Sequence, residues 1–254
     1  MRRFLKITYE YFALYSSLAL LGLICLTWSV FALPLYFILP RRIGTAIGRR
    51  GIMSGFRIYA WSLSVTRTYF LDLRDIDSLR AGPPLILAPN HPSLIDALLI
   101  LTRHPNLVCV MKSALMKNVF LGSGSRLARY VPNDSPRQMI KESVAHLREG
   151  GVLLLFPEGT RTTRAPINAL VGSVGAIAKH ANVPVQTLVI ETNSPFLSKG
   201  WPLFRRPELP IIYRVRLGKR FDPPSDVAAF TVELDRYYRH ELEGALQSSW
   251  LKHA

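Results

Sequence analysis

Acidic residues are scarce in this chain. Only 17 Asp and Glu stand against 32 Lys and Arg among 254 residues, which gives a formal net charge of +15 at pH 7. Such an excess of positive charge attracts anionic lipid surfaces or acidic protein partners. Nucleic acid is the other usual partner of a basic chain, but no recognised nucleic-acid-binding motif accompanies the charge. We therefore expect a lipid surface or an acidic partner, such as acyl carrier protein, and no nucleic acid.

Cysteine is nearly absent as well. The two cysteines, Cys25 and Cys109, both lie in apolar stretches and offer neither a metal-ligand spacing nor a disulfide framework. The histidines other than His91 lack a carboxylate at a suggestive spacing. We therefore predict no metal and no cofactor, and a reducing cytoplasm is compatible with the two free thiols.

Charge of either sign is missing from Tyr11 to Pro40. About 20 apolar residues span the hydrocarbon core of a bilayer, and a cleaved signal peptide has an apolar region of only about 7 to 15 residues. We therefore predict that residues 1–70 hold an uncleaved membrane anchor and an interfacial helix. Pro34 either kinks one spanning helix or divides it from a shallower piece that re-emerges on the same side.

Arginines follow the apolar stretch closely and outnumber the positive charges ahead of it. By the positive-inside rule, the rest of the chain is predicted to lie on the cytoplasmic side of the membrane. Residues 51–69 interleave apolar side chains with arginines, which favours a helix lying at the membrane interface. An ordinary amphipathic helix packed on the domain fits the same residues.

Residues 71–254 are predicted to form one domain, in which strand and helix patterns alternate. The strand candidates are 84–89, 106–111, 152–156, 185–191 and 210–217. The helical candidates are 93–103, 136–149, 168–181 and 225–250. This alternation predicts an α/β fold, a single domain with a mostly parallel sheet flanked by helices, preceded by the N-terminal membrane-anchoring helical segment.

The most informative pair of residues is His91 and Asp96, within Asn90-His91-Pro92-Ser93-Leu94-Ile95-Asp96. Five residues on a regular helix place two side chains roughly 140° apart, so the pair meets only if His91 precedes the helix. Pro92 and Ser93 favour a helix start directly after the histidine. Asp96 would then accept a hydrogen bond from one imidazole nitrogen and leave the other free to act as a base.

A second motif follows the apolar run 152–156. Phe156-Pro157-Glu158-Gly159-Thr160-Arg161 breaks a buried strand with a turn that ends in arginine. A glycine-opened turn with a guanidinium group suits an anion such as phosphate. Together the two motifs indicate transfer of a group onto a hydroxyl.

These blocks, with Val183-Pro184-Val185, resemble in type, order and spacing those of the glycerolphosphate and lysophosphatidate acyltransferase family over roughly residues 80 to 190. The resemblance implies that His91 is the general base and that Asp96 orients it, while an acyl thioester of acyl carrier protein or coenzyme A is the donor. The acceptor would be a lysophospholipid-like hydroxyl. The substrate-binding residues implied are Asn90, Lys112, Glu158, Gly159, Thr160 and Arg161.

One block departs from the family pattern. Many members carry a glycine followed by an arginine that contacts the acceptor phosphate, whereas this chain has Asn133-Asp134 in the corresponding stretch. A carboxylate there repels a phosphate by about 1 kcal/mol or more in a partly buried site. Arg126, Arg129 or Lys112 would have to supply the missing charge. A non-glycerol lipid acceptor is therefore the alternative, while a catalytically silent membrane-binding scaffold or a thioester hydrolase would share the fold.

Overall fold

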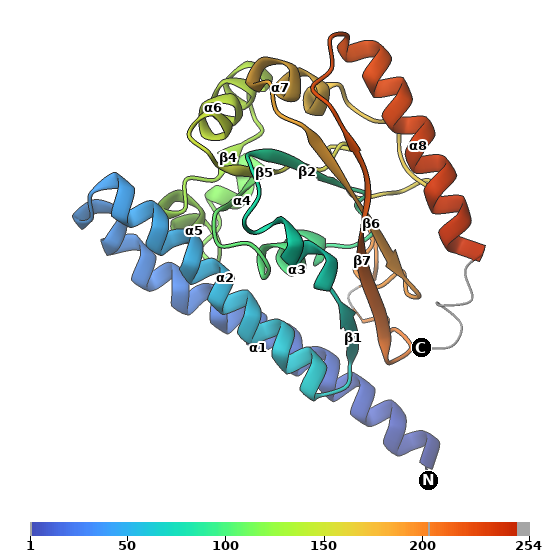
Figure 1. Ribbon diagram of the computed structural model, residues 1–254. Helices are drawn as coiled ribbons and strands as arrows, with labels where there is room; N and C mark the ends of the chain where they lie inside the picture. Colours follow the sequence, from blue (N-terminus) through green and yellow to red (C-terminus); the bar gives the residue numbers. More distant parts are fainter. Residues whose placement is uncertain (1, 203, 248–254) are drawn as a thin grey trace.

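The computed structural model describes residues 2–202 and 204–247 of the chain (Figure 1). Its centre is a seven-stranded sheet in the order β1-β7-β6-β2-β5-β3-β4. All neighbouring strands are parallel except β6 and β7, which are antiparallel. The strands are β1 Tyr69–Asp72, β2 Leu85–Pro89, β3 Leu107–Met111, β4 Val131–Pro132, β5 Val152–Leu154, β6 Val185–Thr192 and β7 Ile211–Phe221. The mostly parallel sheet of the predicted fold class is confirmed.

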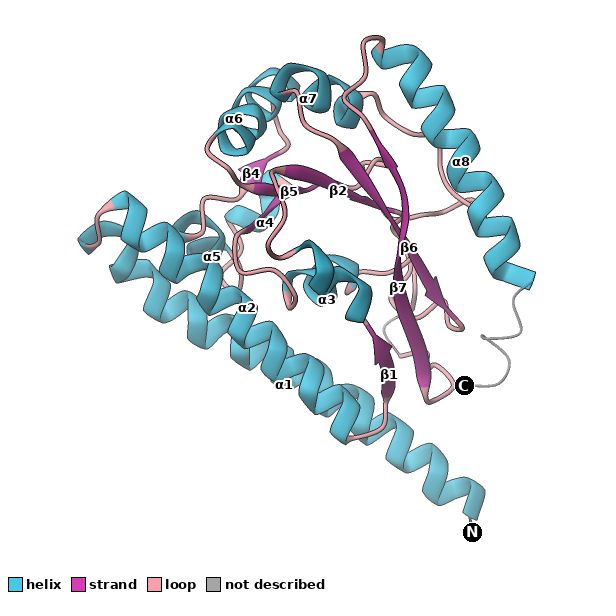
Figure 2. Ribbon diagram, in the orientation of Figure 1, coloured by secondary structure: helices cyan, strands magenta, loops and turns pink. Residues whose placement is uncertain are grey.

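Helices cover both faces of this sheet, as Figure 2 shows. One layer consists of α6 Pro136–Arg148, α7 Ser173–Ala181 and α8 Val227–Gln247. The other side carries the short helices α3 Asp96–Leu101, α4 Ser113–Met116 and α5 Gly122–Leu127, together with two long N-terminal helices. The central strand β2 is buried at every position, as expected of a parallel strand between two helical layers.

The N-terminal helices form a hairpin along one flank of the domain (Figure 1). The first, α1, runs from Arg2 to Ile38 without a break at Pro34, and the chain turns at Leu39-Pro40 into α2, Arg41–Val65. A Cβ atom at Gly48 would lie 2.6 Å from the Ala128 backbone nitrogen, so glycine lets α2 approach α5 closely. Among the described helices, Phe4–Ile38 alone has the length and mean hydropathy, 2.2, to cross a bilayer.

Several elements differ from the sequence prediction. The helix expected from residue 93 begins at Asp96, and the one expected from residue 168 begins at Ser173. The helix expected at 51–69 is the second half of α2, which packs one face on α1 and α5. The strands β1 and β4 and the one-turn helices α4 and α5 were missed because they are too short for a clear period. Residues 248–250 of the last predicted helix lie outside the described residues.

Candidate active site

His91 lies where the chain leaves β2 at the carboxyl edge of the parallel strands. Its Nδ1 is 2.7 Å from Oδ2 of Asp96, the first residue of α3. The histidine precedes the helix, as expected, but Pro92 and Ser93 form a loop rather than a first helical turn. This loop lets the two side chains meet in spite of their five-residue separation.

Both oxygens of Asp96 are occupied. Oδ2 also accepts a hydrogen bond from the Ser93 backbone N–H at 2.8 Å, and Oδ1 accepts one from the hydroxyl of Tyr213 on β7. Complete burial of Asp96 raises the pKa of its carboxyl, while the bonds from His91, Tyr213 and Ser93 oppose that rise. Because an ionised carboxylate only accepts hydrogen bonds, Asp96 favours the tautomer of His91 that carries its proton on Nδ1.

The flat face of the His91 imidazole ring also has a packing partner. It stacks on Phe156 with ring centroids 3.8 Å apart and planes inclined by 22°. Its side chain is 16% exposed, and within residues 4–202 and 204–244 no group is hydrogen-bonded to Nε2. The unprotonated Nε2 is therefore available to a ligand, which is what a general base requires.

Glu158 braces the loop that carries His91. Its Oε1 accepts hydrogen bonds from the His91 backbone N–H at 2.9 Å and from Thr162 Oγ1 at 2.8 Å, and its Oε2 accepts one from the Asn168 N–H at 2.9 Å. Burial raises the pKa of Glu158, and these bonds oppose the rise. With 4% of its surface exposed, Glu158 holds two loops together, and the acceptor contact that the resemblance implied stays a prediction.

Asn90 has a similar structural position. It is 3% exposed, its amide donates to the Ile190 carbonyl at 3.1 Å, and its Oδ1 accepts from the Ile190 N–H at 2.7 Å. The side chain therefore joins the end of β2 to β6. Both of its polar atoms have partners within the protein, and a role of Asn90 in substrate binding stays a prediction.

The remaining predicted residues lie closer to solvent. The Thr162 N–H donates to the His91 carbonyl at 2.7 Å, so the Gly159–Arg161 turn adjoins the histidine. Gly159 is exposed with φ +65°, and Thr160 is half-buried. Arg161 uses Nη1 to hold the carbonyls of Leu197 and Ser198 at 2.8 and 3.1 Å, which leaves other guanidinium donors for an anion. Lys112 is exposed at the end of β3.

An apolar cavity of about 470 Å³ adjoins this site. Leu94 and Ile95, in the loop between His91 and Asp96, line one part of it, and Leu197 beside Arg161 lines another. The rest comes mainly from the helices α1, α2, α3, α4 and α5 and from β3, and includes Trp28, Phe56 and Cys109. A cavity of this size and composition suits a hydrocarbon chain.

Comparison with known proteins agrees with this geometry. Residues 71–191 match the family model described as Acyltransferase. The fold is similar to the crystal structure of the 1-acyl-sn-glycerophosphate acyltransferase PlsC from Thermotoga maritima, with a TM-score of 0.69, 18% sequence identity, and coverage of 98% of this chain and 99% of that one. No curated protein matches the chain. Residues 71–191 therefore identify the protein as an acyltransferase enzyme, and the likeness to PlsC, at 18% identity, shows that the chain shares its fold.

Three residues that support this site could not be found from the sequence alone. Tyr213 is a tyrosine in a strand of alternating pattern, and Thr162 and Asn168 are polar loop residues downstream of the Gly-Thr-Arg turn. Their partners are 117, 4 and 10 residues away in the chain. The first bond is long-range and the other two lie within irregular loops, so none of the three leaves a periodicity in the sequence.

Proposed function

We propose that this enzyme transfers a fatty acyl chain from an acyl thioester to a hydroxyl of a lysophospholipid-like acceptor, with His91 as general base. The observation that carries the proposal is the 2.7 Å hydrogen bond between His91 and Asp96, with no partner for Nε2 among the described side chains and with Leu94 and Ile95, between the two residues, lining an apolar cavity of about 470 Å³. The donor is the thioester of acyl carrier protein or coenzyme A. No cofactor is needed for this chemistry.

In the proposed reaction, His91 accepts one proton from the acceptor and later gives it to the leaving group. His91 Nε2 takes the proton of the acceptor hydroxyl as its oxygen attacks the thioester carbonyl carbon. Asp96 stabilises the imidazolium that forms, because its carboxylate faces Nδ1. When the tetrahedral intermediate collapses, the C–S bond breaks and the imidazolium returns the proton to the leaving thiolate. An ester and a free thiol result.

The substrates have two distinct environments around this base. The apolar cavity accommodates the acyl chain, since its lining is almost wholly carbon. Arg161 and the exposed Lys112 supply positive charge for an anionic headgroup of the acceptor. Gly159 allows the backbone of the turn to approach that ligand.

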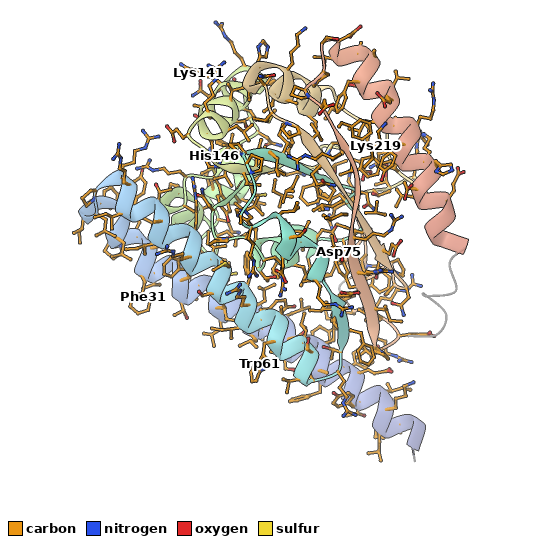
Figure 3. All side chains as sticks on the ribbon, in the orientation of Figure 1. Phe31, Trp61, Asp75, Lys141, His146 and Lys219 are labelled. Atoms are coloured by element: carbon orange, nitrogen blue, oxygen red, sulfur yellow. The ribbon has the colours of Figure 1, made fainter. Side chains whose placement is uncertain are left out.

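We further propose that the helical hairpin lies in the membrane from the cytoplasmic side. Ser29 on α1 donates to the Phe120 carbonyl at 2.7 Å, and α1 lines the apolar cavity, so the helix is packed lengthwise on the domain. Figure 3 shows Phe31 and Trp61 pointing away from the sheet, and they are 61% and 66% exposed. A re-entrant hairpin with its outer face in lipid accounts for both observations better than a helix that leaves the domain to span the bilayer.

The test is mass spectrometry of lipids after incubation of the purified protein with an acyl thioester and a mixed membrane extract. We expect a new acylated lipid and an equal amount of free thiol. His91→Ala and Asp96→Asn should reduce both by at least about a thousandfold, and the exposed His180→Ala should match the wild type. Free fatty acid without acylated lipid would indicate a hydrolase, and no thiol release over any acceptor a silent scaffold.

A lipid acceptor without glycerol phosphate is the second candidate. Asn133-Asp134 follows the edge strand β4 at the same edge of the sheet as Lys112, and both residues are exposed. Arg126 and Arg129 line a separate pocket and so do not supply the charge missing here. An acylated product without phosphorus in the same mass spectra would favour this candidate over a lysophospholipid.

A further inference from the structure

A second pocket, of about 390 Å³, lies at the tip of the helical hairpin. It is bounded by the end of α1, the start of α2, α5, β4 and the last turns of α6. Four arginines line it, and we call it the arginine pocket: Arg41, Arg49, Arg126 and Arg129. Its lining shares Tyr130 with the apolar cavity and includes none of the predicted catalytic or substrate-binding residues.

The arginine pocket is separate from the catalytic site. Val131 and Pro132 of the edge strand β4 line it, and three strand spacings separate β4 from β2, which ends beside His91. At about 4.8 Å per spacing this is roughly 14 Å. The pocket also reaches His146 and Glu149 at the end of α6, which precede the start of β5, whereas His91 lies at the carboxyl edge of the sheet.

The four guanidinium groups are only partly neutralised. Among the side chains of residues 4–202 and 204–244, none of the ion pairs involves Arg41, Arg49, Arg126 or Arg129. Their hydrogen-bond partners are neutral groups: Arg126 donates to the Met116 carbonyl at 2.8 Å, and Arg49 to the Ala128 carbonyl at 3.1 Å. Glu142 and Glu149 also line the pocket, which leaves a net charge of about +2 with His146 neutral.

Arg129 has an unusual backbone. Its φ is +57°, a left-handed conformation that glycine adopts freely and that costs other residues about 1 to 3 kcal/mol. Its guanidinium carbon lies 4.9 Å from the ring centroid of Tyr36, and Nη1 donates to the Tyr36 hydroxyl at 3.4 Å. Arg129 is therefore a strained residue whose guanidinium group contacts the end of α1. Such strain is typical of ligand sites.

The surroundings of the pocket indicate where its ligand comes from. The end of α1 is the most exposed apolar part of the hairpin, with Phe37 and Ile38 76% and 74% exposed. Ile43 and Ile47 continue this surface onto α2. Apolar side chains at the tip would enter the hydrocarbon of a bilayer, and the arginines beside them would then lie at the depth of the headgroups.

We propose that the arginine pocket binds the phosphate group of an anionic glycerophospholipid of the surrounding bilayer. Guanidinium groups pair with phosphate oxygens through two parallel hydrogen bonds, and several around one cavity surround a phosphate. The proposal rests on the membrane placement of the hairpin and not on the acyl-transfer reaction. Its role is to fix the depth and orientation of the hairpin tip.

The test is calorimetric titration of the full-length protein in neutral detergent micelles. The probes are phosphatidylglycerol, diacylglycerol, which lacks the phosphate, and inorganic phosphate, which lacks the lipid. We expect saturable binding of phosphatidylglycerol alone, and at least tenfold weaker binding by Arg41→Gln/Arg129→Gln. The matched control is Arg42→Gln/Arg50→Gln, which removes the same charge from exposed positions outside the pocket lining and should change affinity less than twofold.

Three results would overturn the proposal. Equal weakening in both double variants would mean general attraction to a basic surface, and unchanged affinity in both would mean that the lipid binds elsewhere, for instance in the apolar cavity. Inorganic phosphate binding as tightly as the lipid would make a soluble anion the ligand. Acyl transfer measured in the same micelles should stay within twofold of wild type in both variants, so failure of the proposed reaction leaves the lipid result readable.

Discussion

Tyr213 donates a hydrogen bond to the Asp96 oxygen that faces away from His91, across the 117 residues that separate them in the chain. Both side chains are buried, at 1% and 0% exposure. The bond fixes the carboxylate between β7 and α3, so the sheet itself sets the position of the proposed base. Tyr213 is therefore a positioning residue: it acts on the substrate only through Asp96 and His91.

Tyr213→Phe should lower kcat about tenfold and leave KM for both substrates within twofold, because a hydrogen bond to a charged group is worth about 1.5 to 3 kcal/mol. The same bond lowers the pKa of Asp96, so its loss raises that pKa. The acid limb of the pH–rate profile should then move to higher pH, since Asp96 becomes protonated earlier.

Tyr238→Phe is the matched control for that measurement. Tyr238 is 0% exposed and donates to the Ala88 carbonyl, so its loss costs a buried hydrogen bond without touching Asp96. We expect a similar loss of stability but an unshifted pH–rate profile. If both variants shift the profile alike, Tyr213 has only a structural role.

Glu158→Gln distinguishes a structural role of Glu158 from a contact with the acceptor. The amide keeps one acceptor for the His91 N–H but faces the Asn168 N–H with a donor, and a buried unmatched donor costs about 1 to 3 kcal/mol. Denaturant unfolding should show this loss, with a lower kcat and a nearly unchanged KM for the acceptor. The exposed Glu208→Gln should change neither. A raised KM at full stability would instead favour acceptor binding by Glu158.

Much of this architecture was predictable from the sequence because it depends on patterns within short segments of the chain. The buried strands β2 and β5 are continuous apolar runs, and His91 must precede its helix for the pair with Asp96 to form. What could not be predicted depends on contacts between distant segments. The assignment of Asn90 and Glu158 to substrate binding followed the motif and stays a prediction. Their hydrogen bonds to Ile190 and Asn168, which join separate segments, could not be predicted from the sequence.

The N-terminal apolar segment shows the same limit. Its composition predicted an uncleaved membrane anchor, but whether Pro34 kinked one helix or divided it from a shallower piece was left open. Helix α1 continues through Pro34 because a proline in a helix costs one backbone hydrogen bond, and packing of the hairpin can offset that cost. The turn falls instead at Leu39-Pro40, directly before the first residue of α2, Arg41.

Cys109 offers a test of the apolar cavity as the site of the acyl chain. It lines the cavity from β3, and each buried CH₂ of a ligand is worth about 0.8 kcal/mol. Cys109→Leu narrows the cavity. The ratio of kcat/KM for a 16-carbon acyl donor to that for a 14-carbon donor should therefore fall by up to roughly tenfold, because the two donors differ by two methylenes. Cys109→Ala should shift the ratio the other way.

The control for that experiment is Val108→Leu, the same kind of overpacking at a buried neighbour outside the cavity lining. It should lower stability without changing the ratio of kcat/KM values for the two donors. An equal change of the ratio in Val108→Leu would mean that chain length is sensed by general packing and not by the cavity.

His146 should make the protein less stable in mild acid. It is buried at the end of α6, where Nε2 lies 3.3 Å from the Val152 carbonyl, and burial, with the nearby Arg49 charge, holds its pKa at about 4 (Figure 3). In the unfolded chain the pKa is about 6.5. The unfolded chain therefore binds more protons between these values, and the free energy of unfolding falls by up to about 3 kcal/mol as the pH drops through that window.

His146→Gln separates this effect from the other ionisable groups. The glutamine amide can still donate to the Val152 carbonyl but does not titrate, so denaturant unfolding at pH 7 and pH 5 should give a smaller difference than in the wild type. The matched control is His180→Gln at an exposed position, which should keep the full wild-type difference. Equal pH dependence in all three proteins would mean that His146 is protonated as readily in the fold as in the unfolded chain, and hence that water reaches its ring.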